Sequence, residues 1–278
     1  MSKENTELKD LQKEVEIIKS EVEIHKKKSF SEKFRYLFSL TEDAASHEEI
    51  RERVLSGGKF TGTNMCVLVL AILIASVGLN TGSTAVIIGA MLISPLMGSI
   101  LAMAYGTASV DVDIVTTHIL GFITQIVISI TTSAIYFSLS PIKTATSELL
   151  ARTQPRFFDV IIAICGGLAG IIGQTRKDKA NNIIPGVAIA TALMPPLCTC
   201  GYAIANSSLK MFLGAFYLFL VNSYFIYMSS TVILSILQVP KVKDLSEKQW
   251  VRLHKRMIRN AILISIPTII IGVLMVYE

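Results

Sequence analysis

From about residue 60 onward, the chain alternates between long apolar stretches and short polar connections. Each stretch is long enough to cross a bilayer as a helix, so the pattern predicts an all-α integral membrane protein with about seven transmembrane helices. The tripeptide Asn80-Thr81-Gly82 predicts a tight turn between the first two. Because no hydrophobic segment precedes Asn64, we expect the first span to direct insertion without a cleavable signal peptide. The predicted spans are 65–79, 83–105, 114–139, 157–173, 183–205, 211–237 and 261–277.

Two of these spans carry proline at matching places. Residues 83–105 contain Pro95, and a stretch about a hundred residues later contains Pro196. Aligning the two prolines gives seven identities in 21 positions, including the Pro-Leu step. We therefore predict an internal repeat of residues 60–140 and 141–240, with 241–278 outside it. Since three spans per copy is an odd number, the copies would be inverted in the membrane. The expected fold is a 3+3 inverted repeat plus one extra helix.

The first 59 residues are polar and predict a cytoplasmic helical region. Within 4–28, apolar residues recur at alternating spacings of three and four, which indicates a possible coiled coil between subunits. A single amphipathic helix lying on its own chain or on the membrane surface explains the same spacing. We also predict a helix that starts near Thr41 and stops at Gly57-Gly58. The residues of the apolar seam are Leu8, Leu11, Val15, Ile18 and Val22.

The charges predict how the spans are oriented. Hydrophobic residues make up 51% of the chain and charged residues 17%, which excludes a soluble or disordered class. Thirteen Lys and Arg lie on the side of the N-terminus and only Lys143, Arg152, Arg156 and Lys210 on the other. The positive-inside rule therefore places the N-terminus in the cytoplasm. The basic segment 241–260 is expected to lie along the membrane interface, and no nucleic-acid module is recognisable.

Four stretches resemble a known membrane family. They read IASVGLN (74–80), STAVIIGAMLISPLMGSILAMAYG (83–106), GGLAGIIG (166–173) and IPGVAIATALMPPLCTCGYAIA (184–205). Together they are similar to the bacterial and archaeal membrane family called domain of unknown function 389, over roughly residues 60–238. The resemblance implies a multi-pass protein of a bacterial or archaeal cytoplasmic (inner) membrane. It implies no activity, and it does not explain the N-terminal region.

The prolines direct attention to one possible site. A proline inside a span removes a backbone donor and frees the carbonyl one turn earlier, and broken helices at matching places of two inverted halves are typical of transporter midplane sites. A simple kink satisfied by neighbouring hydroxyl groups is the alternative. Gln125 and Asn222 fall at equivalent places on the third and sixth spans, within about one helical turn. The candidate residues of a solute path are Ser94, Pro95, Gln125, Thr191, Pro195, Pro196 and Asn222.

Other features limit the chemistry. Apart from Asp159, near the start of 157–173, no Asp, Glu, Lys or Arg falls within a predicted span, which disfavours a proton relay. Cys198 and Cys200 point to different faces of a helix, so we expect no metal, and no cofactor or enzyme motif is found. The glycines around Gly167 predict close helix packing, with a flexible gate as the alternative.

Two functions remain open from the sequence. The first is a transporter or channel for a small anion or neutral solute, with a site at the broken helices. The second is an oligomeric membrane scaffold or sensor that acts through the coiled coil and the basic segment 241–260. Both interpretations expect a homo-oligomer in contact with membrane lipids, and neither involves nucleic acid.

Overall fold

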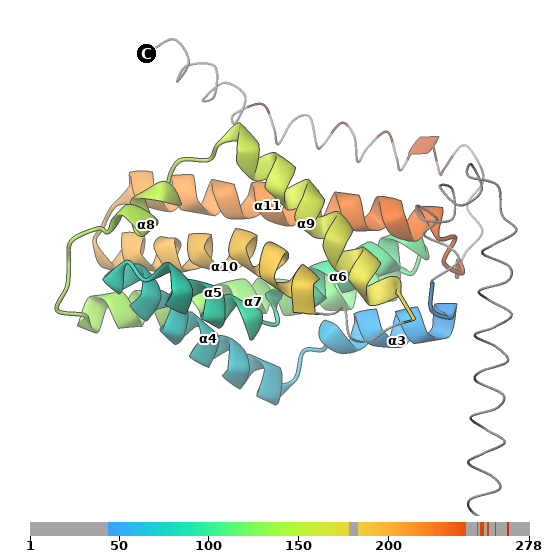
Figure 1. The fold of residues 1–278 in the computed structure, drawn as a ribbon, viewed down its shortest axis with the longest axis horizontal. Helices are drawn as coiled ribbons and strands as arrows, with labels where there is room; N and C mark the ends of the chain where they lie inside the picture. Colours follow the sequence, from blue (N-terminus) through green and yellow to red (C-terminus); the bar gives the residue numbers. More distant parts are fainter. Residues whose placement is uncertain are drawn as a thin grey trace, which may run out of the picture. The chain divides into compact units, whose positions relative to one another are not determined.

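The computed structural model describes residues 44–177 and 183–242, with side chains from 193 in the second range, and six isolated positions between 249 and 266. The chain divides into two compact units, 1–44 and 45–278, and the second is described below. The predicted coiled coil, the start at Thr41 and the seventh span apart from Ile266 lie outside the described residues. The helices are α3 (His47–Gly57), α4 (Gly62–Thr81), α5 (Thr84–Leu92), α6 (Leu96–Ala108), α7 (Val112–Leu139), α8 (Ser147–Ala151), α9 (Phe157–Thr175), α10 (Ile183–Ala205) and α11 (Leu209–Ile236) (Figure 1).

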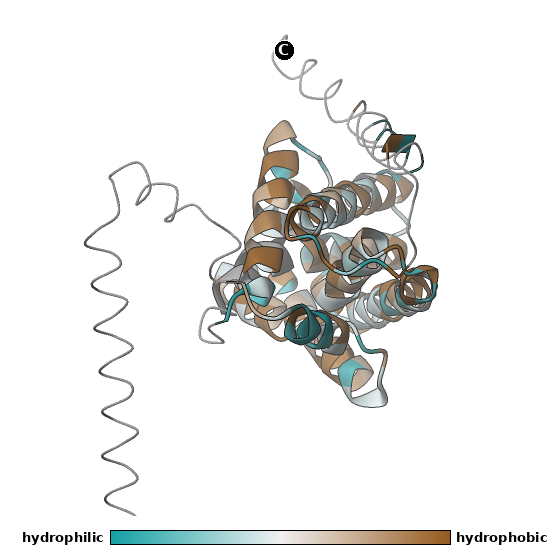
Figure 2. Ribbon diagram, turned by 90° about the vertical axis from the view of Figure 1, so that its right-hand side faces the viewer, coloured by the Kyte–Doolittle hydropathy of each residue, from teal (hydrophilic) through white to brown (hydrophobic). Residues whose placement is uncertain are grey.

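The described residues form helices, and four or five of these are candidate membrane spans by length and composition. α4, α7, α9 and α11 are each long and apolar enough to cross a bilayer, and the bent pair α5 and α6 makes a fifth candidate. α10 is 23 residues long, and its part with described side chains, Leu193–Ala205, is apolar. Hydrophobic residues cover most of the long helices, whereas hydrophilic residues gather at their ends and connections (Figure 2).

Hydrogen bonds between helix ends establish the direction of each helix. At one end of the bundle, here the α3 end, Ala45 N donates to Thr175 O at the close of α9 over 2.7 Å, and Val242 N donates to Ser109 O over 2.8 Å. At the opposite end, the α8 end, Thr146 Oγ1 donates to Leu79 O, where α4 closes, over 2.7 Å. Consequently α4, α7 and α10 run from the α3 end to the α8 end, and α5–α6, α9 and α11 run back (Figure 1).

The turn between α4 and α5 forms as the sequence predicts. Gly82 adopts a left-handed conformation with φ of 67°, and its backbone N–H donates to the carbonyls of Gly78 and Leu79. Ser83 N then donates to Gly78 O over 2.8 Å. Glycine suits this position because a side chain would strain a left-handed backbone. The turn returns the chain into the membrane after only two residues outside a helix.

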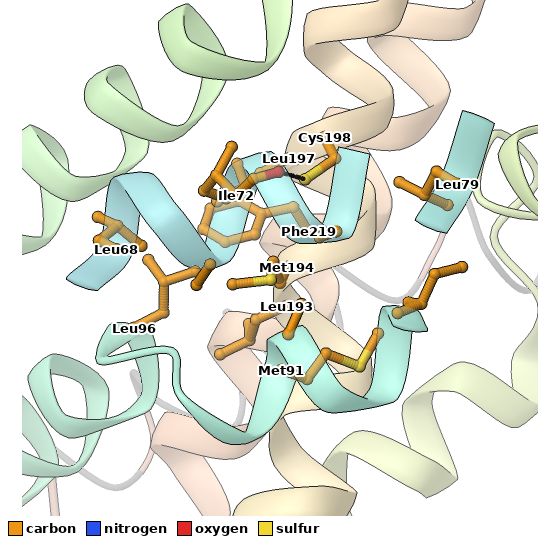
Figure 3. Packing of buried hydrophobic residues seen from close by; sticks show 14 of the residues in the cluster. Leu68, Ile72, Leu79, Met91, Leu96, Leu193, Met194, Leu197, Cys198 and Phe219 are labelled. Atoms are coloured by element: carbon orange, nitrogen blue, oxygen red, sulfur yellow. Dashed lines mark hydrogen bonds between the residues drawn. The ribbon is translucent and has the colours of Figure 1, made fainter. Parts of the chain in front are cut away.

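A cluster of large apolar side chains fills the centre of the bundle. Leu68 and Ile72 of α4, Leu96 of α6 and Phe219 of α11 are buried together, with Leu193 of α10 beside them (Figure 3). α7 contributes less to this core, and it exposes large side chains such as Leu120 and Val127 along its length. Because no water is present in the hydrocarbon to drive apolar burial, such a core is held mainly by close packing.

Buried hydroxyl groups connect the helices across this core. Ser76 Oγ on α4 donates to Ser133 Oγ on α7 over 3.2 Å, and Ser133 Oγ donates to Cys198 O on α10 over 2.8 Å. Ser133 and Ser76 are both fully buried. The pair of bonds therefore links three helices through one serine, and it fills the hydrogen-bonding capacity of a hydroxyl that has no water nearby.

Replacing this serine should give a small loss of stability. We expect Ser133→Ala to destabilise the protein by about 1 kcal/mol, because interhelical hydrogen bonds in membranes contribute about that much. Thermal unfolding in detergent checks this value. Thr124→Val is the matched control, since Thr124 is exposed on the same helix and donates only to Leu120 O. An equal shift in both variants would contradict the assignment.

α3 is a short amphipathic helix packed against the membrane helices. Ser46 caps its start by accepting a hydrogen bond from Glu49 N at 3.3 Å, and Ile50 and Val54 are buried. Its last residue, Gly57, and the next, Gly58, lie directly against Gly98 in the first turn of α6. The helix stop predicted at Gly57-Gly58 is confirmed, and the helix begins at His47.

Candidate functional site

The helix break predicted at Pro95 is present. α5 ends at Leu92 and α6 begins at Leu96, and the two helices are bent by 47°. Short turn bonds satisfy the backbone between them, with Ser94 N donating to Met91 O over 3.2 Å and Gly98 N to Pro95 O over 3.2 Å. Ser94 Oγ also accepts from Leu96 N at 3.4 Å. The break is therefore a defined turn held by short hydrogen bonds.

The second proline pair does not break its helix. α10 continues from Ile183 to Ala205 with Pro195 and Pro196 inside it, so the half-helix start expected after Pro196 is not formed. The flanking side chains of Met194 and Leu197 are fully or almost fully buried in the central cluster, which holds the helix together despite two missing N–H donors (Figure 3). Thr199 Oγ1 bonds back to Pro195 O over 2.9 Å.

Gln125 ties the helix after the break to α7. Its side chain is 1% exposed, and its Oε1 accepts a hydrogen bond from Ser99 Oγ on α6 at 3.0 Å. Ser99 lies one turn beyond Pro95, on the first turn of α6. The hydroxyl group of Ser99 therefore connects the buried amide of Gln125 to the helix that follows the break.

Asn222 occupies the matching position on α11. α7 and α11 are each 28 residues long, and Gln125 and Asn222 are each the fourteenth residue of their helix. Asn222 is 4% exposed. One turn earlier on each helix, the rings of Phe122 and Phe219 stack at 5.8 Å between centroids. The equivalent residues Phe122 and Phe219 thus contact each other one turn before Gln125 and Asn222.

The other predicted site residues differ in how deeply they are buried. Ser94 and Pro95 are partly buried at the break, and Pro195 and Pro196 are buried within α10. The side chain of Thr191 lies outside the described residues. The prolines of the two halves are therefore unlike in structure, whereas the amides on α7 and α11 are alike in position and burial.

Two polar contacts near this region could not be predicted from the positions of the prolines. Ser99, which bonds to Gln125, reads in the sequence as a small residue inside an apolar run. Thr107 Oγ1 at the end of α6 lies 2.9 Å from Tyr227 Oη on α11. Both join α6 to the third helix of a half, one in each half, and only the three-dimensional packing brings them together.

The described residues contain no cluster of three or more His, Cys, Asp or Glu side chains that could hold a metal ion. The described spans contain acidic or basic residues only in their first turns, at Asp113, Asp159 and Lys210. His118 lies on α7 with Nδ1 3.1 Å from Gly58 O. Hydroxyl groups, amides and backbone dipoles are therefore the polar groups at the middle of the described bundle.

Comparison with known proteins confirms the family resemblance. Residues 91–228 match the model of the family described as domain of unknown function (DUF389). An uncharacterized protein of Methanocaldococcus jannaschii is 30% identical over 172 residues, which are 62% of this chain and 53% of the archaeal one. The chain thus spans about half the length of that relative. No solved structure matches.

Proposed function

We propose that this chain, which resembles the DUF389 family over residues 91–228, is a membrane protein that moves a small anionic or neutral solute between two inverted three-helix halves. The halves are α4 to α7 and α9 to α11, with the solute path beside Gln125 and Asn222. The observation that carries the proposal is the identical position of these two buried amides on helices of equal length. Buried polar residues facing a bundle interior are typical of solute pathways.

The helix directions support an inverted relation between the halves. α4 starts at the α3 end, whereas α9 starts at the α8 end. The turn before the third helix has the same form in each half, with Asp111 N donating to Gly106 O over 2.8 Å and Ser208 N to Ala203 O over 2.9 Å. Val110 and Ser207 take positive φ of 59° and 52° at the same place in these turns.

The helix break gives the two halves different roles in this proposal. The turn at Pro95 places the start of α6, which carries Ser99, next to Gln125 on α7. In the other half, α10 continues through its two prolines without a break. Helix N-termini carry partial positive charge, which favours anions and polar neutral molecules. The described spans carry no charged side chain beyond their first turns. This suits a solute that is neutral, or an anion that is bound by helix N-termini and not by a charged side chain.

We further propose that the N-terminus faces the cytoplasm and that α3 lies on that side. The described residues at the α3 end include Arg51, Arg53, Lys59, Arg176, Lys177 and Lys241, and those at the α8 end include Lys143, Arg152, Arg156 and Lys210. Short-loop Lys and Arg residues are retained on the cytoplasmic side. The basic sequence that follows residue 240 adds to the excess at the α3 end.

Flux measurements with paired variants test the solute path. In liposomes, we expect Gln125→Leu and Asn222→Leu each to lower the flux of a permeant small solute about tenfold or more, because each replaces a buried amide at mid-depth with an apolar side chain. Thr124→Val is the control, since it changes a neighbouring exposed side chain of α7. Panels of small anions and neutral solutes should be screened first with the unaltered protein.

The alternative, an oligomeric scaffold or sensor, gives different outcomes. Deleting residues 1–40 removes the predicted coiled-coil segment, so a scaffold should lose its assembly, whereas flux through the bundle should survive. Absence of flux for every small anion and neutral solute, together with loss of assembly after this deletion, would reject the transporter in favour of the scaffold.

A further inference from the structure

A cavity at the α3 end lies outside the proposed solute path. It has a volume of about 370 Å³ and is lined by α3, by the end of α6 and start of α7, and by residues 240–242 after α11. Ligand cavities for small molecules typically measure about 300 to 1,000 Å³, whereas a single water occupies about 30 Å³. The cavity is therefore large enough for a small ligand.

Tyr105 has a hydroxyl group without a partner at this cavity. The residue is only 3% exposed, it lines the cavity, and within the described part of the chain its hydroxyl makes no hydrogen bond. The hydroxyl is not one of the buried polar atoms that lack a partner in the described part of the chain, so it is accessible from the cavity and can donate a hydrogen bond to a ligand there.

Arg51 brings a guanidinium group to the same cavity. The described ion pairs of arginine join Arg53 to Glu49 and Arg152 to Glu148, and Arg51 is in neither. Lys241 lines the cavity from the segment after α11. Two cationic side chains from distant parts of the sequence therefore line one cavity.

Each of the two carboxylates at the cavity lies at the start of a helix, where the partial positive charge of the helix offsets part of its negative charge. Asp111 caps α7, and its Oδ1 accepts from Asp113 N at 3.1 Å and from Ile114 N at 3.2 Å. Glu48 lies in the first turn of α3. Because helix N-termini carry partial positive charge, they reduce the effect of both carboxylates on a ligand. The helix starts therefore offset part of the negative charge of the carboxylates, and Arg51 can still attract an anion into the cavity.

The walls of the cavity are fixed by contacts of their own. Ile50 and Val54 anchor α3 on the bundle with 1% and 2% exposure. Val242 N donates to Ser109 O over 2.8 Å, which holds the segment after α11 against the end of α6. A site with walls fixed before binding does not have to order them when a ligand enters.

We propose that this cavity binds a phosphate group, with Arg51 pairing with the phosphate oxygens and Tyr105 donating a hydrogen bond to one of them. Arginine matches phosphate because its planar N–H groups make two parallel charge-assisted bonds. The phosphate can belong to a soluble molecule or to a lipid headgroup at the membrane surface. This site is independent of the solute path at Gln125 and Asn222.

Thermal unfolding of the full chain in detergent tests the site with three probes: inorganic phosphate at constant ionic strength, dioctanoyl phosphatidylglycerol, and dioctanoylglycerol as its phosphate-free counterpart. We expect stabilisation by at least one of the two phosphate-bearing probes and none by dioctanoylglycerol. Stabilisation by inorganic phosphate identifies a soluble ligand, and stabilisation by phosphatidylglycerol alone identifies a headgroup.

Two variants assign the response to named residues. Tyr105→Phe should weaken the affinity for the stabilising probe about fivefold, and Arg51→Gln about tenfold or more, in line with one neutral and one charge-assisted bond. Without probe, Tyr105→Phe should unfold like the parent, because its hydroxyl has no partner to lose among the described residues. Lys59→Gln makes the same charge change as Arg51→Gln at an exposed position outside the cavity lining, and it should respond like the parent. Failure of both phosphate probes to stabilise the parent, or unchanged responses in both cavity variants, would overturn the proposal.

Discussion

Gly98→Ala is expected to destabilise the protein strongly, although alanine is the better helix former. A Cβ at residue 98 would overlap the carbonyl of Gly57 and come within 2.8 Å of Gly58 N. Both are backbone atoms, so no rotamer change relieves the overlap and α3 has to move away from α6. We expect a net loss of about 2 to 4 kcal/mol, since the overpacking cost exceeds the gain of about 1 kcal/mol in helix propensity.

Gly89→Ala is the matched control for this variant. Gly89 lies on α5, the other half of the same broken span, and a Cβ there meets no atom within 4 Å. We expect this variant to unfold at the parent temperature or slightly above it. Thermal unfolding in detergent checks both, and limited proteolysis near residues 57–61 should increase only in Gly98→Ala. Equal stability of the two variants would show that α3 does not pack on α6 in this way.

Gly167→Ala is expected to separate α9 from α11. A Cβ at residue 167 would overlap Ser229 Oγ and lie 2.8 Å from both Cα and O of Ile226. The new methyl group would also crowd the hydrogen bond from Ser230 Oγ to Gly167 O, which is 3.2 Å long. A loss of about 1 to 3 kcal/mol is expected, as for other overpacked contacts between helices.

A double variant separates the two clashes of Gly167→Ala. Adding Ser229→Ala removes the side-chain overlap but leaves the approach to the Ile226 backbone, so it should restore only part of the lost stability. Unfolding temperatures of the single and double variants measure this coupling. Full restoration would mean that the two backbones are not in tight contact, and it would favour the gate interpretation of these glycines over the packing one.

The spans were predictable because their signals are local. Apolar length fixes α4, α7, α9 and α11 to within a few residues, and Gly82 marks the end of α4 through its left-handed backbone conformation. The prolines show where local reasoning stops. Pro95 and Pro196 carry the same chemistry, yet only the first lies at a break, because packing around the second holds α10 as one helix.

The residue-by-residue alignment of the two halves could also be determined only from the structure. Aligning the prolines pairs Ala102 with Ala203, whereas the turns before α7 and α11 pair Gly106 with Ala203. The extra residues of the first half lie after the break, within α6, because Gly106 is farther along the chain from Pro95 than Ala203 is from Pro196. The sequence placed Gln125 and Asn222 within a turn of each other, and the helix bounds put them at the same position.

The cavity at Tyr105 was beyond the reach of sequence patterns. Its cationic residues, Arg51 and Lys241, lie almost at opposite ends of the described chain, and no spacing rule links them to a tyrosine at the end of α6. Arg51 reads in the sequence as one more positive charge beside the membrane. Only the packing of α3 on the bundle gives it a role in recognition.

The bond from Ala45 N to Thr175 O sets an order for biosynthesis. Residue 45 leaves the ribosome 130 residues before its acceptor, which sits at the far end of the fourth crossing in the chain. α3 can pack on α6 as soon as the second crossing is in place, whereas the bond at Ala45 has to wait until four crossings have entered the bilayer. Completion of this docking is a late event of translation, and a nascent chain arrested before residue 175 should leave Ala45 more open to protease than in the full chain.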